Sequence, residues 1–345
     1  MKRLTDIAAQ VARPKERLGA VMRRFNELPN AFIIVVDGRR RPIGTVTDGD
    51  VRRAILDGLT LEAEVTKVMN ARPIIGRLDD PAAARRMLEQ VPFVPMIDEA
   101  GALVEIWRAA PAETRIAAAL VMAGGYGRRL GKHTKRDPKP LLAVGDKPIL
   151  GHILARLEEC GIRNLYVSTH YLAERIETYL DRRAGSSRPA VIREEISLGT
   201  AGALSLLPRQ IDGPVLVING DVLTKLDLGA LDYYHHTHGH DGTIAVSPYR
   251  VAVPYGVIRQ DEKGIFQRID EKPTLTYFVA AGIYMLGPEF CRLVPPKTRI
   301  DMPELLNLGR AAGLKIGLFP IHEYWVDVGR PDDLDAANRD HKAEH

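Results

Sequence analysis

The stretch that most constrains the fold of this 345-residue chain runs from residue 116 to residue 142. It opens with the apolar segment Ile116–Ala123, whose length and composition predict a buried parallel strand. Three glycines follow within residues 124–127, where they permit a positive φ and let backbone N–H groups approach an anion. Basic side chains come next: Arg128, Arg129, Lys132, Lys135 and Lys139. The stretch predicts an anion-binding loop, and triphosphate is the anion that suits it best.

The spacing in this loop is more specific than a glycine-rich turn. It lacks the Gly-Lys-Ser/Thr of a Walker A loop and is not Gly-x-Gly-x-x-Gly. It reads Gly-Gly-x-Gly-x-Arg-Leu, and Lys139 follows inside Pro-Lys-Pro. This pattern resembles the signature of the nucleoside-diphosphate-sugar pyrophosphorylases, the sugar-1-phosphate nucleotidyltransferases. Arg128 stands where that family usually has Thr. The alternative interpretation is a strand-to-helix turn with a solvated basic loop.

Composition narrows the classes of function. The 48 basic and 44 acidic residues are spread evenly, so no basic surplus predicts a nucleic-acid partner. Two cysteines, Cys160 and Cys291, argue against a disulfide framework and fit a reducing compartment. No apolar window has the length of a membrane span, and no signal peptide is recognisable. We expect a soluble cytoplasmic protein without a membrane partner.

Residues 1–112 are predicted to form a separate unit with an internal repeat. Residues 32–51 and 94–106 look alike at a separation of about 61 positions. Each has an apolar strand, an acidic turn and a second strand, which is typical of a β-hairpin. Paired units of this kind share one core. Helical patterns flank them at Lys15–Leu28, Val51–Leu56 and Pro81–Gln90.

This repeat resembles a tandem pair of CBS domains, a Bateman module. The resemblance implies an adenine nucleotide whose ribose contacts Thr47 and Asp50. A hydroxyl and a carboxylate at a helix start suit two ribose hydroxyls, although the same pair equally suits a cap for a helix that begins at Val51. The second repeat lacks Thr-x-x-Asp, so at most one nucleotide site is expected. Residues 108–115 are small and polar and predict a linker.

From residue 116 to residue 345 strands and helices alternate, which predicts an α/β catalytic domain. We expect a Rossmann-like mixed, mostly parallel sheet with helices on both faces and a substrate crevice at the carboxyl ends of the strands. The nucleotidyltransferase resemblance implies the same nucleotide-diphospho-sugar transferase fold. The predicted elements are helices at Ile149–Cys160, Tyr171–Arg182, Thr200–Leu207 and Leu334–His341, and strands at Asn164–Ser168, Ala190–Arg193, Pro214–Ile218 and Ala280–Tyr284.

Two carboxylates are candidate metal ligands. Asp221 ends the apolar stretch Val215–Asp221, and Mg²⁺ takes oxygen ligands of this kind. Asn-Gly-Asp alone is more often a turn, but here it resembles the family's Gly-Asp metal motif. Residues 325–329 resemble its Trp-x-Asp-x-Gly, which implies Asp327 as the second ligand. Asp333 is expected to cap the following helix.

Further motifs resemble the family's substrate sites. Residues 194–203 resemble the segment that cradles the nucleotide base, with Thr200 as an alternative helix cap. The resemblance implies nucleotide binding by Ala123, Gly124, Gly125, Gly127, Arg129, Gly199 and Thr200. It implies sugar binding by Asn219, Gly256, Glu271, Lys272 and Gly282. It implies catalytic roles for Arg129, Lys139, Asp221 and Lys272.

The implied reaction joins a nucleoside triphosphate to a sugar 1-phosphate with Mg²⁺ and releases pyrophosphate, for surface-glycan precursors. The Leu-Gly-Thr-Ala-Gly run at 198–202 resembles guanylyltransferases for mannose-like sugars and favours GTP over UTP and dTTP. The sugar 1-phosphate stays open among glucosamine, mannose and heptose 1-phosphates. A homo-oligomer is expected by resemblance. Alternatives are a GT-A glycosyltransferase, whose Asp-x-Asp motif is poorly matched here, a cytidylyltransferase for a non-sugar phosphate, and a non-catalytic nucleotide-sensing protein.

Overall fold

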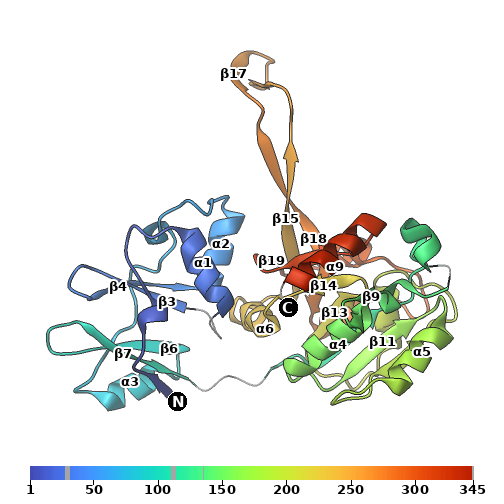
Figure 1. The fold of residues 1–345 in the computed structure, drawn as a ribbon, viewed down its shortest axis with the longest axis horizontal. Helices are drawn as coiled ribbons and strands as arrows, with labels where there is room; N and C mark the ends of the chain where they lie inside the picture. Colours follow the sequence, from blue (N-terminus) through green and yellow to red (C-terminus); the bar gives the residue numbers. More distant parts are fainter. Residues whose placement is uncertain (28–31, 110–113, 135, 344–345) are drawn as a thin grey trace. The chain divides into compact units, whose positions relative to one another are not determined.

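The chain forms two compact units, Met1–Glu113 and Thr114–His345. A computed structural model describes residues 1–27, 32–109, 114–134 and 136–343 (Figure 1). The division falls at the stretch that predicts a linker, of which residues 110–113 lie outside the described residues, as does Leu28 of the first predicted helix. No helix in the described ranges is both long and apolar enough to span a membrane.

The first unit holds two small sheets, each with its own helices. The first sheet has the order β2-β3-β4: Val11–Ala12, Phe32–Val36 and Pro42–Thr47, with α1 (Leu18–Glu27) and α2 (Asp48–Leu56). The second has the order β1-β7-β6-β5: Lys2–Leu4, Leu103–Arg108, Phe93–Ile97 and Gly76–Arg77, with α3 (Pro81–Met87).

The predicted internal repeat is present in the first unit. The β3/β4 and β6/β7 pairs are antiparallel hairpins, and each carries a register shift at the equivalent place, Val35/Val36 and Met96/Ile97. Each hairpin also has a short parallel strand beside its first strand. Phe32 and Phe93 begin the equivalent strands and stack with ring centroids 4.0 Å apart. The two repeats therefore share one core, while their identity as CBS domains stays a prediction.

A seven-stranded sheet forms the centre of the second unit, as predicted from the alternation of strands and helices. Among the described strands of this sheet, only β18 runs against the others. The sheet is therefore mixed and mostly parallel. Its order is β12 (Ala190–Arg193), β11 (Leu165–Thr169), β8 (Ala118–Met122), β13 (Val215–Asn219), β18 (Thr274–Leu286), β15 (Gly242–Ala252) and β19 (Ile316–Pro320).

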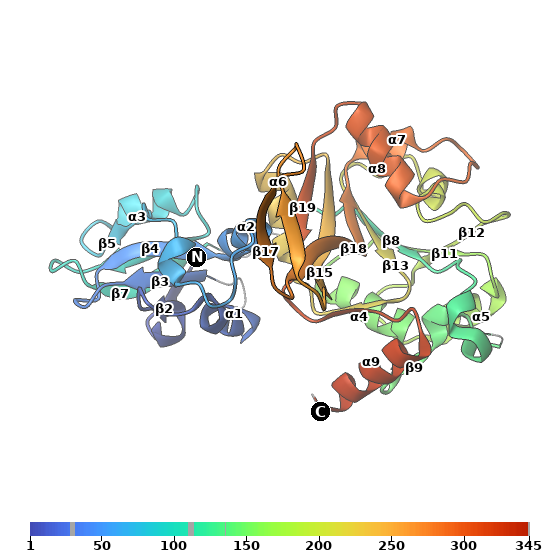
Figure 2. The ribbon, with the colours of Figure 1, turned by 90° about the horizontal axis from the view of Figure 1, so that it is seen from above.

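Helices cover both faces of this sheet (Figure 2). Alternate residues of β13 face opposite cores, because successive side chains of a strand point to opposite sides: Leu216 joins one cluster and Val217 the other. The Leu216 side is covered by α4 (Ile149–Glu159), α5 (Ala173–Arg182), α6 (Leu228–Thr237) and α9 (Pro331–Ala343). The Val217 side is covered by α7 (Pro288–Leu293) and α8 (Met302–Ala311).

One predicted helix is wrong. Thr200–Leu207 contains only a short 3-10 helix at Gly202–Leu206. Gly199 has a φ of +79°, and a Cβ there would lie 2.6 Å from the carbonyl oxygen of Ile300. The segment is therefore held by close packing on the residues before α8, which a local helical pattern does not reveal.

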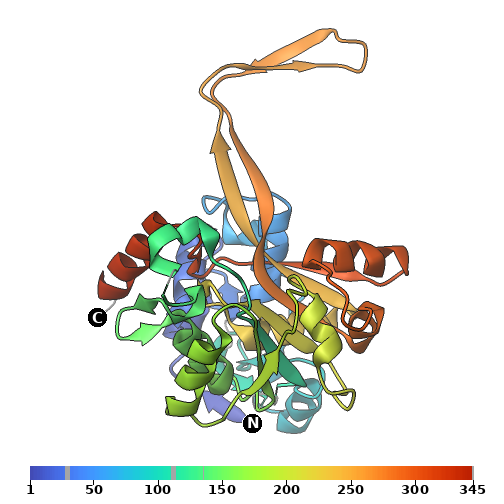
Figure 3. The same cartoon turned by 90° about the vertical axis from the view of Figure 1, so that its right-hand side faces the viewer.

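The second unit also contains a projecting β-ribbon, which the sequence did not predict. The ends of β15 and β18 extend beyond the central sheet, and β16 (Val257–Gln260) and β17 (Phe266–Asp270) continue them as a hairpin. Figures 1 and 3 show this ribbon projecting away from the sheet and bending near the hairpin. Two further strand pairs are short: β9 (Ala143–Val144) with β10 (Lys147–Pro148), and β14 (Val222–Thr224) with β20 (Trp325–Asp327).

Candidate active site

The two candidate metal ligands lie side by side. Asp221 follows β13 and precedes β14, whereas Asp327 ends β20. The antiparallel pairing sets Val222 opposite Asp327, and the N–H of Val328 donates to the carbonyl of Asp221 at 3.0 Å. Residues more than 100 positions apart thus meet at the carboxyl end of β13.

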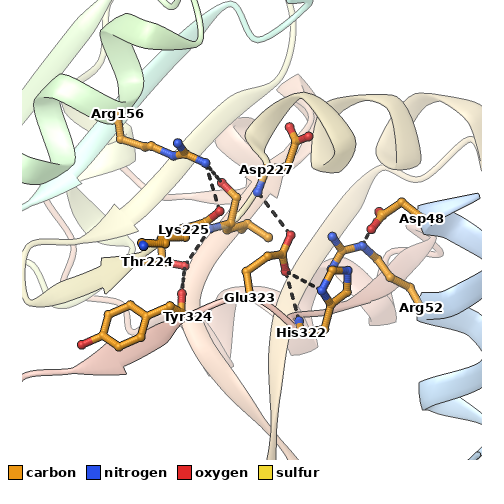
Figure 4. Close-up of polar contacts among 10 residues, drawn as sticks. Asp48, Arg52, Arg156, Thr224, Lys225, Asp227, His322, Glu323 and Tyr324 are labelled. Carbon is orange, nitrogen blue, oxygen red and sulfur yellow. Dashed lines mark hydrogen bonds and ion pairs between the residues drawn. The ribbon is translucent and has the colours of Figure 1, made fainter. Parts of the chain in front are cut away.

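Hydrogen bonds next to this strand pair fix its register (Figure 4). The carbonyl of Tyr324 accepts from the Thr224 hydroxyl and from the Lys225 N–H, both at 2.9 Å. The Arg156 guanidinium donates to the carbonyls of Lys225 and Leu226, each at 3.0 Å, which attaches the segment to α4. These hydrogen bonds therefore stabilise the strand pairing that brings Asp221 next to Asp327.

Lys139 lies between the two carboxylates. Its ammonium donates to Asp221 Oδ2 and lies 3.5 Å from Asp327 Oδ1, and the side chain is only 9% exposed. Asp221 Oδ1 is buried and accepts no hydrogen bond from the part of the chain that the structure describes. Burial and the neighbouring Asp221 carboxylate raise the pKa of Asp327, although Lys139 and Arg129 oppose this effect. One ammonium thus lies between two close carboxylates.

A cavity of about 340 Å³ adjoins this cluster. Asn219 and Gly282, two of the residues predicted to bind sugar, line it together with Asp327. Gly282 has a φ of +72°, and a Cβ there would lie 2.7 Å from Asn219 Nδ2, so the close contact requires glycine. Trp325 Nε1 donates to the carbonyl of Ala281 at 2.9 Å and fixes one wall. The other lining residues are Val222, Tyr249, Val279, Ala280 and Ala281.

The glycine-rich loop follows β8 at the same edge of the sheet. Gly127 alone of its three glycines has a positive φ, +61°, and a Cβ there would lie 3.3 Å from Lys139 Cβ. The Arg129 guanidinium lies 3.6 Å from the position of a Cβ on Gly329, two residues beyond Asp327. The loop therefore presents Arg129 to the carboxylate cluster. Ala123 is buried below the loop, and the side chain of Arg128 lies outside the described residues.

The predicted base segment lies beside this loop, but Thr200 is engaged elsewhere. Its N–H donates to Asp301 Oδ1 at 2.9 Å, and its hydroxyl accepts from the Met302 N–H at 2.7 Å. Thr200 therefore caps α8 rather than the predicted helix after it, so that capping prediction is wrong. Asp333, the predicted cap of the last helix, accepts a hydrogen bond from the Arg330 N–H at 2.7 Å. It lies inside α9, which begins at Pro331 rather than at Leu334.

Glu194 belongs to this edge and was not selected from the sequence. It follows β12, its Oε2 accepts from the Leu198 N–H at 2.9 Å, and burial raises its pKa. A Cβ on Gly124 would lie 3.3 Å from Glu194 Oε1. The rule that selected Asp221, a carboxylate directly after a sheet strand, also selects Glu194.

The remaining predicted sugar ligands lie on the projecting ribbon. Gly256 packs against Glu271, since a Cβ there would lie 3.0 Å from Glu271 Oε2. Lys272 follows with a φ of +44°. Neither Gly256, Glu271 nor Lys272 is among the described residues that line the cavity. The structure thus separates the predicted sugar ligands into a cavity group and a ribbon group.

In the first unit, Thr47 and Asp50 form a capping box on α2. The Thr47 hydroxyl accepts from the Asp50 N–H at 3.3 Å, and Asp50 Oδ2 accepts from the Thr47 N–H at 2.8 Å. The capping interpretation is therefore confirmed, although α2 begins at Asp48 rather than at Val51. Nucleotide binding by these residues stays a prediction.

Comparison with known proteins identifies the second unit. Residues 118–344 match the nucleotidyl transferase family. The chain belongs to this family. The prediction of a nucleotidyltransferase is thereby confirmed at the level of the family.

This chain has curated relatives in animals and plants. It is 32% identical over 223 residues to the mannose-1-phosphate guanylyltransferase catalytic subunit beta of Drosophila pseudoobscura pseudoobscura, covering 63% of this chain and 60% of that protein. It is also 32% identical over 228 residues to a probable mannose-1-phosphate guanylyltransferase 1 of Oryza sativa subsp. japonica, covering 62% of each. The chain therefore spans about 60% of the length of these relatives.

Solved structures share the fold of the second unit. HddC from Yersinia pseudotuberculosis is 25% identical with a TM-score of 0.51, over 65% of this chain and 99% of that one. A putative glucose-1-phosphate thymidylyltransferase from Bacillus anthracis, in complex with a sucrose, is 21% identical with a TM-score of 0.51, over 64% of this chain and 94% of that one. The predicted α/β fold with a largely parallel central sheet is confirmed.

Proposed function

We propose that this chain transfers a nucleoside monophosphate from a nucleoside triphosphate to a sugar 1-phosphate, forming a nucleotide-sugar and pyrophosphate for surface-glycan precursors. The observation that carries the proposal is the group of Asp221, Asp327 and Lys139 between the glycine-rich loop and the cavity. Acidic and basic groups at one strand edge, beside a cavity with polar and apolar walls, suit a reaction between two phosphates. The names of the curated relatives support this class of reaction.

The carboxylate pair fits Mg²⁺. Asp221 Oδ1 is buried without a donor among the described residues, and the proximity of Asp221 contributes to the raised pKa of Asp327. Two close carboxylates with an orphaned oxygen suit a hard divalent cation. Asp221 and Asp327 would hold the ion, which when bound supplies positive charge to the phosphoryl oxygens.

The chain's own residues position the reactants. Arg129 and the loop amides bind the β- and γ-phosphates, and Lys139 lowers the repulsion between two anionic substrates. Asn219 and the Gly282 backbone bind sugar hydroxyls in the cavity, and Lys272 binds the sugar phosphate. A phosphate oxygen of the sugar is already anionic at neutral pH, so the step needs no general base. This phosphate oxygen attacks the α-phosphorus of the nucleotide directly, and no covalent enzyme intermediate forms.

GTP is the proposed nucleotide, with UTP and dTTP as alternatives. Guanine offers adjacent N1–H and N2–H₂ donors, and a carboxylate accepts such donors with charge-assisted hydrogen bonds. Glu194 is the carboxylate next to Gly124, and the relatives named above are guanylyltransferases or probable ones. Gly199 lets the base segment pack closely on Ile300 and Asp301. A mannose-like sugar 1-phosphate is the proposed acceptor.

Substitution of Asp221 tests the proposal. We expect Asp221→Asn to stay folded and to lose turnover by about 10²–10³-fold, because the metal and Lys139 lose a charged partner. The measurement is pyrophosphate release with GTP and mannose 1-phosphate, alongside circular dichroism. The matched control is Asp212→Asn, an exposed carboxylate away from the cluster. Wild-type turnover in the Asp221 variant would exclude this site.

We also propose that the first unit is a CBS pair that binds one adenine nucleotide near Thr47 and Asp50. Support comes from the two equivalent hairpins that share a core. Asp50 already accepts from Thr47, so the nucleotide has to compete with a capping box. Calorimetric titration with ATP, ADP and AMP is expected to give heat for the wild type and none for Asp50→Ala. Absence of heat with all three nucleotides would refute it.

A further inference from the structure

The turn between β11 and α5 contacts the loop that begins with the glycines, and it does so at both ends of that loop. The Tyr171 N–H donates to the carbonyl of Gly124 at 3.4 Å, and the Tyr171 hydroxyl donates to the carbonyl of Thr134 at 3.4 Å. Arg175, in the first turn of α5, pairs with Asp137 at 3.1 Å. The turn therefore brackets the loop from its first glycine to its far end.

The backbone of this turn is strained at Leu172. This residue has a φ of +52°, in the left-handed region that residues with a Cβ rarely adopt. Strain of this kind persists where the surroundings fix it, and it is concentrated at sites that bind ligands. Tyr171 precedes Leu172 and bonds the loop, so the strained turn is held in contact with the loop.

His170 opens the turn and connects two segments of the candidate site. Its Nδ1 lies 3.0 Å from the carbonyl oxygen of Glu194, and its Nε2 lies 3.2 Å from the hydroxyl of Tyr126 in the loop. A carbonyl oxygen only accepts, so Nδ1 carries the hydrogen and donates. In the neutral ring Nε2 then accepts from the Tyr126 hydroxyl. The Tyr126 ring also packs on Tyr171, with ring centroids 5.3 Å apart.

The start of the loop packs against both His170 and Glu194. A Cβ on Gly124 would lie 3.2 Å from His170 Cβ and 3.3 Å from Glu194 Oε1. The Glu194 carboxylate is itself fixed, because its Oε2 accepts from the Leu198 N–H at 2.9 Å. The loop proposed to bind phosphates and the carboxylate proposed to read the base therefore meet at His170.

We propose that His170 is a positioning residue for the nucleotide. Through Tyr126 on one side and the Glu194 carbonyl on the other, it fixes the glycine-rich loop relative to the Glu194 carboxylate. Triphosphate and base are then bound by one preorganised unit. The effect of His170 on nucleotide binding rests on the proposed function, whereas its effect on the order of the loop does not.

Hydrogen exchange tests the order of the loop without an activity assay. Mass spectrometry of the peptide covering residues 124–134 follows amides such as that of Leu130, which donates to a carbonyl within the loop. We expect this peptide to exchange at least about fivefold faster in His170→Ala and in Tyr126→Phe than in the wild type. Tyr126 is 43% exposed, so its variant should stay folded. The matched control is His238→Ala, another histidine whose Nδ1 lies 3.0 Å from a backbone carbonyl, and its loop should exchange as in the wild type.

Two exchange results would overturn the proposal. One is an unchanged rate for the loop peptide in His170→Ala. The other is an increase that extends equally over α4 and α5, because that would show a general loss of stability rather than a local loss of order in the loop.

Steady-state kinetics with GTP and mannose 1-phosphate separate positioning from a merely structural role. We expect the KM for GTP to rise about tenfold in His170→Ala and about fivefold in Tyr126→Phe, as for the loss of two and of one hydrogen bond. The kcat and the KM for mannose 1-phosphate should stay within about twofold, because the lost interaction serves nucleotide binding. A structural role would instead lower kcat through loss of active protein. An unchanged KM for GTP in His170→Ala would contradict the proposal.

The double variant Tyr126→Phe, His170→Ala tests whether the two residues act through each other. Its KM for GTP is expected to equal that of His170→Ala, because the tyrosine hydroxyl has lost its acceptor on His170 in either case. Additive effects of the two substitutions would contradict the coupling. A folded wild type that releases no pyrophosphate would refute the proposed function, and the exchange rates would then decide the role of His170.

Discussion

At the scale of residues, the catalytic proposal depends on charge balance within one small group. The sequence points to Asp221 as a carboxylate after an apolar strand, to Asp327 through Trp-x-Asp-x-Gly, and to Lys139 through the loop signature. Their mutual contact required the fold, because each lies on a different segment. The sequence also proposed positive φ for the loop glycines, but only Gly127 among the three at 124–127 adopts it. Local patterns identify the residue types, and tertiary packing decides which of them meet.

A buried histidine makes stability depend on pH. His235 lies on α6 with Nδ1 2.9 Å from Thr243 Oγ1. Burial and the nearby His236 and His240 lower its pKa to about 4 from 6.5, despite opposing effects of Asp232 and Asp241. Between these values the unfolded chain binds a proton that the folded chain excludes. The stabilisation is therefore complete above pH 6.5 and is lost as the pH falls toward 4.

We expect this group to contribute up to about 3 kcal/mol to the decrease in unfolding free energy between pH 6.5 and pH 4. Urea unfolding of the second unit at a series of pH values measures it. His235→Gln cannot take up the proton, so its unfolding free energy should vary less steeply with pH. Identical pH profiles for the wild type and this variant would contradict the assignment.

At the scale of elements, the sequence predicts the strands of the central sheet, but it does not predict the conformation of the segments that connect them and carry candidate site residues. Runs such as Val215–Asn219 predict buried strands because both faces are covered. The helix predicted after Thr200 failed because Gly199 and Thr200 pack on residues before α8, which lie about 100 positions away. The projecting ribbon was missed for the opposite reason. Its residues alternate as those of strands do, but the local sequence does not indicate how far a strand pair extends beyond its sheet.

The engagement of Thr200 predicts an effect on stability. Thr200→Val keeps the shape of the side chain and removes the oxygen that accepts from the Met302 N–H. We expect a loss of about 1 kcal/mol in unfolding free energy, as for other helix caps, whereas Thr200→Ser should retain most of it. Chemical denaturation measures both variants. A Thr200→Val protein as stable as the wild type would show that the cap contributes nothing.

At the scale of the whole molecule, the chain has two units: the second is assigned to a family, and the first is described by its internal repeat. The family match covers residues 118–344, and within it Lys139, Asp221 and Asp327 meet at one edge of the sheet. The first unit shows a repeat whose hairpins are equivalent down to the position of a register shift. The sequence revealed both patterns because motif spacing and repeats are local. It did not reveal the separation of Glu271 and Lys272 from the cavity, which depends on the course of the projecting ribbon.

The most direct measurement is pyrophosphate release with Mg²⁺ from GTP, UTP, dTTP, CTP and ATP, each paired with a panel of sugar 1-phosphates. We expect one strongly favoured pair, GTP with a mannose-like sugar 1-phosphate, and no release when the sugar phosphate is omitted. Preference for UTP or dTTP would keep the reaction and correct the base. No release from any pair by folded, full-length protein would contradict the proposed nucleotidyl transfer.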